Sequence, residues 1–149
     1  MTDLLEALHV PLLEEVSGLE LAPEGLRGQL DLRYGMLAFH IDHEAEAERL
    51  RVSVRLPPPP AGGHEFLVFC LALNVESLTA KVGLDESGYL VVHADLPATT
   101  ESEPELLRDE IIASIDDIAD LIDDSLCSYL LEERLGTPAQ LERWGGESE

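Results

Sequence analysis

The chain has 149 residues, and its 31 Asp and Glu against 9 Lys and Arg give a formal net charge of −22 at pH 7. Hydrophobic residues make up 45% and charged residues 27%, a composition typical of one globular domain with a single core rather than of a disordered chain. The negative charge excludes direct contact with DNA or RNA, because that contact needs cationic groups at the phosphates, and it opposes binding to anionic lipid.

The N-terminal stretch MTDLLEALHVPLLEE places acids among its leucines and lacks the basic start of a secretory signal. No apolar run reaches the ~20 residues that cross a bilayer. We therefore expect a cytoplasmic protein that does not contact a membrane. Cys70 and Cys127 lie far apart and form no C-x-x-C pair, so we expect two reduced core thiols and neither a metal site nor a cofactor.

The first predicted element is a helix, because Leu4, Leu8 and Leu12 recur at helical spacing. Pro11 removes a helical hydrogen bond, so we expect either a kink or two short helices. From residue 28 to residue 56 the apolar period changes to two. This change predicts three half-buried strands of an antiparallel sheet, with one side facing solvent or a partner.

The third of these strands carries arginines on its polar side. Arg49, Arg51 and Arg55 alternate with apolar residues, and we expect them to pair with nearby acids or with a second copy of the sheet. Arg51 and Arg55 are therefore candidate partner-binding residues. On the preceding strand, His40 and His43 point to opposite faces, so they are not expected to share a metal ion.

The proline run over residues 57–60 ends the third strand, since proline cannot donate to a sheet hydrogen bond. The segment over residues 64–76 is a nearly continuous apolar run and fits either a buried strand or a buried helix. Apolar alternation returns between residues 78 and 96, interrupted by the turn sequence DESG. This pattern predicts a hairpin of two further strands.

The longest predicted element is a helix over residues 103–135, with Ser102 as its N-cap, Pro104 in its first turn and Gly136 after its end. Its apolar residues recur three and four apart and define one buried stripe. Residues 136–149 are expected to form a short, flexible tail. Residues 1–135 are thus predicted to be a single domain.

Aspartates crowd the polar side of this helix. The stretch DDIADLIDD, residues 116–124, begins with the D-D-x-x-D pattern with which diphosphate enzymes hold magnesium. Such enzymes are all-helical and also need a second acidic cluster and cations for the diphosphate, whereas this sequence predicts strands and has one lysine and no second D-D-x-x-D. Two alternatives remain, a metal-dependent enzyme of another kind that uses these carboxylates as ligands, or a face kept acidic for a basic partner. The candidate partner-binding residues here are Asp116, Asp120, Asp123 and Asp124.

The order helix, three strands, apolar segment, two strands and long acidic helix resembles the YbjN-like domain and, through it, the class I chaperones of type III secretion. The most similar stretch is Leu73-Asn74 followed by LTAKVGLDESGYLVVHADLP, residues 78–97, and the resemblance covers most of residues 1–135. It implies that residues 64–76 form a helix. It also implies a homodimer that binds segments of client proteins without hydrolysing nucleotide.

We therefore predict an α+β fold, in which a twisted antiparallel sheet of about five strands is flanked by an N-terminal helix, a short middle helix and a long acidic C-terminal helix. The predicted function is that of a non-enzymatic, chaperone-like or adaptor module for a client protein with a basic surface, a group that includes DNA-binding proteins. The competing hypotheses are the metal-dependent enzyme and a small-ligand sensor with a pocket between the sheet and the long helix.

Overall fold

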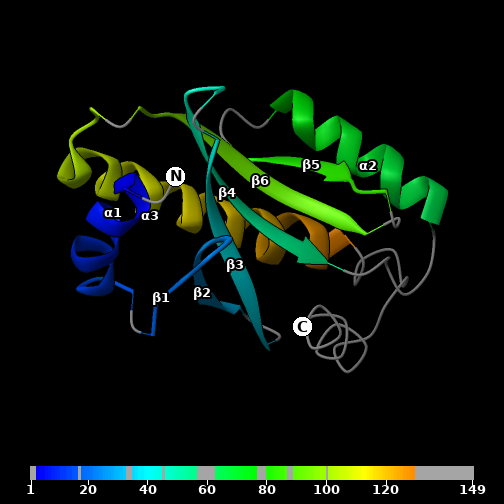
Figure 1. The fold of residues 1–149 in the computed structure, drawn as a ribbon. Helices are drawn as coiled ribbons and strands as arrows, with labels where there is room; N and C mark the ends of the chain where they lie inside the picture. Colours follow the sequence, from blue (N-terminus) through cyan, green and yellow to red (C-terminus); the bar gives the residue numbers. More distant parts are fainter. Residues whose placement is uncertain are drawn as a thin grey trace.

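The computed structural model describes residues 3–16, 18–32, 35–44, 46–56, 63–76, 80–86, 89–99 and 101–129. In chain order the elements are α1 (Asp3–Leu13), β1 (Glu20–Ala22), β2 (Gly25–Leu32), β3 (Gly35–Glu44), β4 (Arg49–Leu56), α2 (Gly63–Glu76), β5 (Lys81–Leu84), β6 (Leu90–Pro97), α3 (Pro104–Asp120) and the π-helical segment η1 (Leu121–Cys127). The described strands form one antiparallel sheet in the order β1-β2-β3-β4-β6-β5, flanked by the helices (Figure 1). The predicted α+β fold is confirmed, with one strand more than expected, the short β1.

The side chains of strand β4 alternate between a buried face of the sheet and a polar face. Its even-numbered residues from Leu50 to Leu56 are buried, and the residues that alternate with them point to the other side. This alternation confirms the predicted half-buried strand. Helices α1 and α3 pack on the buried face. We call the other face, which carries Arg49, Arg51 and Arg55, the open sheet face.

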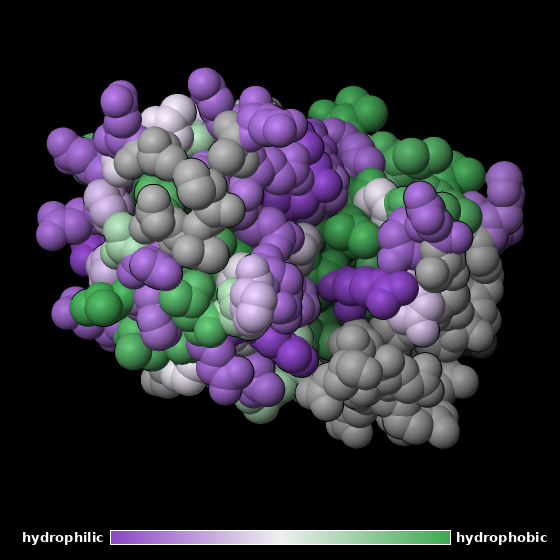
Figure 2. Space-filling view, in the orientation of Figure 1, coloured by the Kyte–Doolittle hydropathy of each residue, from purple (hydrophilic) through white to green (hydrophobic). Residues whose placement is uncertain are grey.

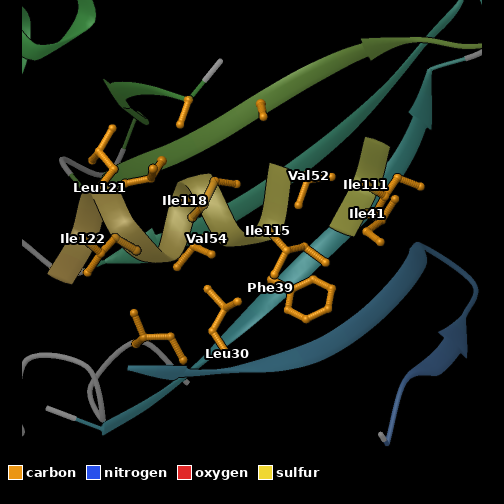
Figure 3. Packing of buried hydrophobic residues seen from close by; sticks show 14 of the residues in the cluster. Leu30, Phe39, Ile41, Val52, Val54, Ile111, Ile115, Ile118, Leu121 and Ile122 are labelled. Atoms are coloured by element: carbon orange, nitrogen blue, oxygen red, sulfur yellow. The ribbon is translucent and has the colours of Figure 1, made fainter. Parts of the chain in front are cut away.

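The core lies between the buried face of the sheet and α3. In Figure 3, Ile115 of α3 lies beside Phe39 of β3, and Ile118 lies beside Val54 of β4. Ile111, further toward the start of α3, lies beside Ile41 of β3, and all six side chains are buried. Burial of each such side chain contributes about 1.5–3 kcal/mol. The isoleucines of α3 belong to the apolar stripe expected from their spacing, so the amphipathic character predicted for this helix is confirmed.

Pro11 lies inside α1, in its last turn. The chain nevertheless forms one helix there, so the alternative of two short helices is wrong. Loss of the Pro11 N–H removes one helical hydrogen bond, and the helix ends at Leu13, where Val16 N donates to Leu12 O at 2.7 Å. Leu8 and Leu12, both fully buried, hold this helix against the rest of the core.

Residues 64–76, which the apolar pattern could not assign to a strand or to a helix, lie in the helix α2. This is the assignment that the family resemblance implied. One side of α2 is packed: Phe66 and Cys70 are buried, and the Phe69 ring stacks on Tyr129 with centroids 4.0 Å apart. The opposite side is also apolar, although it is exposed. A helix with apolar residues on both sides has no helical period in its sequence, which explains why the pattern alone could not identify it.

Asn74, near the end of α2, holds the edge strand β5. Its Nδ2 donates to Val82 O at 2.7 Å, and its Oδ1 accepts from Val82 N at 2.7 Å. Lys81 Nζ donates in turn to Asn74 O at 2.8 Å. These bonds satisfy backbone groups through which an edge strand can pair with another chain. Asn74, one of the residues that carried the resemblance, thus joins α2 to the sheet.

The C-terminal helix starts one residue later than expected. Its N-cap is Glu103 and its first residue is Pro104, whereas Ser102, the expected cap, accepts a hydrogen bond from Thr99 N through Oγ at 2.9 Å. Ser102 therefore stabilises the preceding turn instead of the helix. After Asp120 the chain continues as the π-helical η1, in which the backbone turn is wider than in an α-helix.

The predicted helix end at residue 135 and the flexible tail over residues 136–149 lie outside the described residues. Cys70 and Cys127 are both buried in the core, as expected, and form no disulfide with each other. Burial raises the pKa of Cys70 to about 11. Within the described part of the chain, no helix has the length and hydropathy needed to cross a membrane.

Candidate functional site

The predicted site residue Arg51 lies on the open sheet face, directly across from Asp95 of β6. Its Nε and Nη2 donate to the two carboxylate oxygens of Asp95 at 2.7 and 3.0 Å. Such two-bond pairs are the strongest contacts between guanidinium and carboxylate groups. The hydrogen bond from Arg51 lowers the pKa of Asp95 below its ordinary value, so this carboxylate is charged at neutral pH.

Arg55, the second predicted site residue on this face, is held by the β5–β6 hairpin. Its Nε donates to Asp85 Oδ2 at 2.7 Å, and its guanidinium carbon lies 4.0 Å from the centre of the Tyr89 ring. Arg51 and Arg55 thus pair with acids of their own chain, one of the two alternatives that the sequence left open. Arg55 still has 49% of its side chain exposed, which leaves it accessible to a partner.

The pair of Arg51 and Asp95 gives a pH-dependent contribution to stability. Because the pKa of Asp95 is lowered in the folded state, the contribution is fully present above the ordinary value of 3.8 and is lost as the pH falls through the lowered value. We expect Asp95→Asn to cost less than about 1 kcal/mol at pH 7, since the pair is partly exposed. Urea unfolding at pH 7 and at about pH 3 checks this, and an equal difference from the wild type at both would contradict it.

The four predicted acidic residues lie on α3 and on the segment η1 that continues it. Asp116 and Asp120 are exposed on α3, Asp124 is exposed in η1, and Asp123 is half-buried there. Across the residues that the structure describes, no group of three His, Cys, Asp or Glu side chains is arranged to hold a metal ion. What this stretch presents is the polar side of an amphipathic helix.

The two histidines of β3 lie on opposite faces of the sheet, as their spacing predicted. His40 pairs in register with Ser53 of the open sheet face, and His43 pairs with the buried Leu50. His93 of β6 lies near the ion pair, with its Nδ1 3.6 Å from an Asp95 oxygen. Burial is the main cause that lowers the pKa of His93, so this ring is neutral at pH 7.

The structure does not bring the acidic and the cationic site residues together. Asp116 and Asp120 are exposed on the outer side of α3, whose inner side packs on the buried face of the sheet. Arg51 and Arg55 project from the open sheet face, on the other side of the sheet. They form two separate surfaces, and a single small contact with a partner cannot include both.

An apolar surface on α2 was missed by the sequence reasoning. Val68 (53% exposed), Leu71 (65%) and Val75 (86%) lie on the outer side of α2, and Leu84 (55%) lies on the neighbouring β5. We call these four residues the outer α2 surface. Figure 2 shows apolar atoms gathered over α2, and an apolar groove of about 240 Å³ runs between α2 and β5. The signal was the uninterrupted run FLVFCLAL, because a helix with no polar side must expose part of it.

Comparison with known proteins gives matches by structure. No protein-family model matches the sequence, and no curated protein matches it. YbjN from E. coli is similar over 80% of this chain and 90% of its own, with a TM-score of 0.63 and 19% identity. A chain of the ExsC–ExsE complex is similar over 85% and 96%, with a TM-score of 0.60 and 18% identity.

The HopA1–SchA chaperone–effector complex also contains a similar chain, with a TM-score of 0.52 and 19% identity over 79% of this chain and 93% of that one. The described residues therefore have a YbjN-like, secretion-chaperone-like fold, as the resemblance implied. At these identities the fold is what the proteins share.

Proposed function

We propose that this chain is a non-enzymatic, chaperone-like or adaptor module that binds a segment of a client protein. The observation that supports this most is the fold it shares with a chain of a chaperone–effector complex. Two buried cysteines that form no disulfide with each other fit a reducing compartment, so we place the module in the cytoplasm.

The proposed assembly is a homodimer formed through the outer α2 surface. Two copies that each carry a formal charge of −22 repel one another wherever acidic faces meet. The outer α2 surface consists of uncharged side chains and borders an apolar groove, so two copies can approach there without that repulsion. Burial of these side chains would supply the hydrophobic contribution that a stable dimer needs.

The proposed client carries a basic surface, as DNA-binding proteins do, and meets the acidic side of α3 and η1. Asp116 and Asp120, four residues apart, repel each other at a cost of about 0.2–0.5 kcal/mol. A helix that only needed to be solvated would not require this repulsion. Asp123 and Asp124 extend the same acidic side, and Arg51 and Arg55 offer a second contact on the open sheet face.

Removal of two of these charges should raise the stability of the chain and slow its association with the client. In Asp116→Asn/Asp120→Asn, we expect the free energy of unfolding to rise by about 0.2–0.5 kcal/mol, because a like-charge pair is lost. We expect the rate of association with the client at low salt to fall at least about threefold, because steering is weakened.

The client is first captured on the immobilised chain from the native lysate at low salt, then purified and studied by stopped-flow mixing over a range of salt concentrations. The matched control is Asp31→Asn/Glu86→Gln, which removes the same charge from exposed positions elsewhere; we call it the remote control pair. An association rate that does not change with salt, or that falls equally in the remote control pair, would contradict the steering role.

A further inference from the structure

A second groove, of about 520 Å³, lies between α1 and the start of α3. Helix α1 and the start of α3 both lie at the opposite end of the molecule from α2 (Figure 1). Part of the lining is apolar, with Ala7, Val10 and Pro11 from α1 and Pro104 from α3. Val10 is 67% exposed, so an incoming apolar side chain can bury this valine together with the two prolines.

Carboxylates lie beside these apolar residues. Glu14, directly after α1, and Glu103 and Glu105 at the start of α3 line the same groove, and all three are exposed. Arg108, which also lines it, donates to Asp109 Oδ1 at 3.2 Å, so a neighbouring acid offsets its charge. The positive end of the α3 dipole corresponds to about half an elementary charge, which is too little to cancel three carboxylates.

We propose that this groove binds a client segment in which an apolar side chain lies between lysine or arginine residues. The inference rests on the proposed function and adds the place and the chemistry of client binding. The apolar side chain packs on Val10 and Pro11, and the flanking cations meet Glu14, Glu103 and Glu105. Partly exposed ion pairs of this kind select the partner more than they tighten binding.

The charge of the groove decides between this occupant and others. An acidic segment would be repelled by the three glutamates, and so would a second copy of this chain that approached with its own acidic faces. A basic segment would instead find further carboxylates along α3: Asp116 lies about 16 Å beyond Glu105 at the rise of an α-helix. The groove and the acidic side of α3 can therefore bind one continuous basic segment.

Fluorescence anisotropy with the full chain tests the proposal. The probe is a labelled peptide of glycine and serine that contains one leucine with two lysines on each side. We expect Glu103→Gln/Glu105→Gln to weaken binding about fivefold at low salt, and Val10→Ser to weaken it about threefold through the lost apolar contact. Replacement of the leucine by serine in the peptide should weaken binding to the wild type as Val10→Ser does.

Two matched controls separate the groove from general effects of charge and hydrophobicity. The remote control pair removes the same charge as Glu103→Gln/Glu105→Gln, and Met36→Ser removes an exposed apolar side chain from β3, outside both the groove and the outer α2 surface. Both should keep the affinity of the wild type within about twofold. With a photoreactive leucine analogue in the peptide, we expect cross-links within residues 7–14 and 103–108.

The outcomes distinguish the groove from the function on which it rests. Cross-links outside the groove, equal weakening by the controls, or no effect of the leucine in the peptide would overturn the groove and leave a protein-binding function intact. If neither this peptide nor its neutral and acidic versions binds, the groove is overturned and the proposed function loses support as well.

Discussion

Replacement of Phe66 with Ala is expected to lower the free energy of unfolding by about 3–5 kcal/mol. Phe66 is fully buried between α2 and the rest of the core, and its ring lies 6.1 Å from that of Tyr129, centroid to centroid. The substitution removes the apolar contacts of the ring and leaves a cavity that the surrounding side chains fill only in part. Urea unfolding followed by far-UV circular dichroism measures the loss.

Two other residues of α2 provide the comparison. Phe69 stacks on Tyr129 but is only partly buried, so Phe69→Ala should cost less than Phe66→Ala, about 1–2 kcal/mol. Leu71→Ala, at an exposed position, should change stability by less than about 0.5 kcal/mol. If Phe66→Ala cost no more than Leu71→Ala, α2 would not be packed on the core as described.

The proposed dimer is expected to dissociate when charge is placed on the outer α2 surface. Leu71→Asp/Val75→Asp should raise the dissociation constant of the dimer at least about a hundredfold, because carboxylates would have to lose water without a partner. A symmetric dimer also contains each substitution twice. Light scattering and sedimentation over a range of micromolar concentrations measure the change.

The control for this prediction is Val10→Asp, which places a carboxylate at a valine on α1 that is about as exposed as Leu71, far from α2 (Figure 1). It should leave the dimer intact. The folded monomer should keep its stability within about 0.5 kcal/mol in Leu71→Asp/Val75→Asp, since both positions are exposed. A wild-type chain that is monomeric at these concentrations, or a dimer that persists in Leu71→Asp/Val75→Asp, would refute the proposed interface.

The sequence by itself determined the elements whose residues face one buried side and one polar side. The alternation from Arg49 to Leu56 fixed both the strand and its faces, because successive side chains of a strand point in opposite directions. The same argument placed His40 and His43 on opposite faces, and the three-and-four spacing from Ile111 to Ile118 identified the amphipathic helix α3. The candidate residues Arg51, Arg55, Asp116 and Asp120 were recognised in this way, as single residues on known faces.

Only the tertiary structure decided how these faces lie relative to one another. It set Arg51 against Asp95, 44 positions later in the chain, and placed the acidic and cationic candidates on different surfaces. It also showed which apolar residues of α2 remain exposed, and it formed the groove from Val10 and Pro104, which are far apart in sequence. The spacing of apolar and polar residues along the chain indicates whether a side chain faces water or the core. Which neighbour that side chain contacts depends on how distant segments pack, and no short stretch of sequence contains that information.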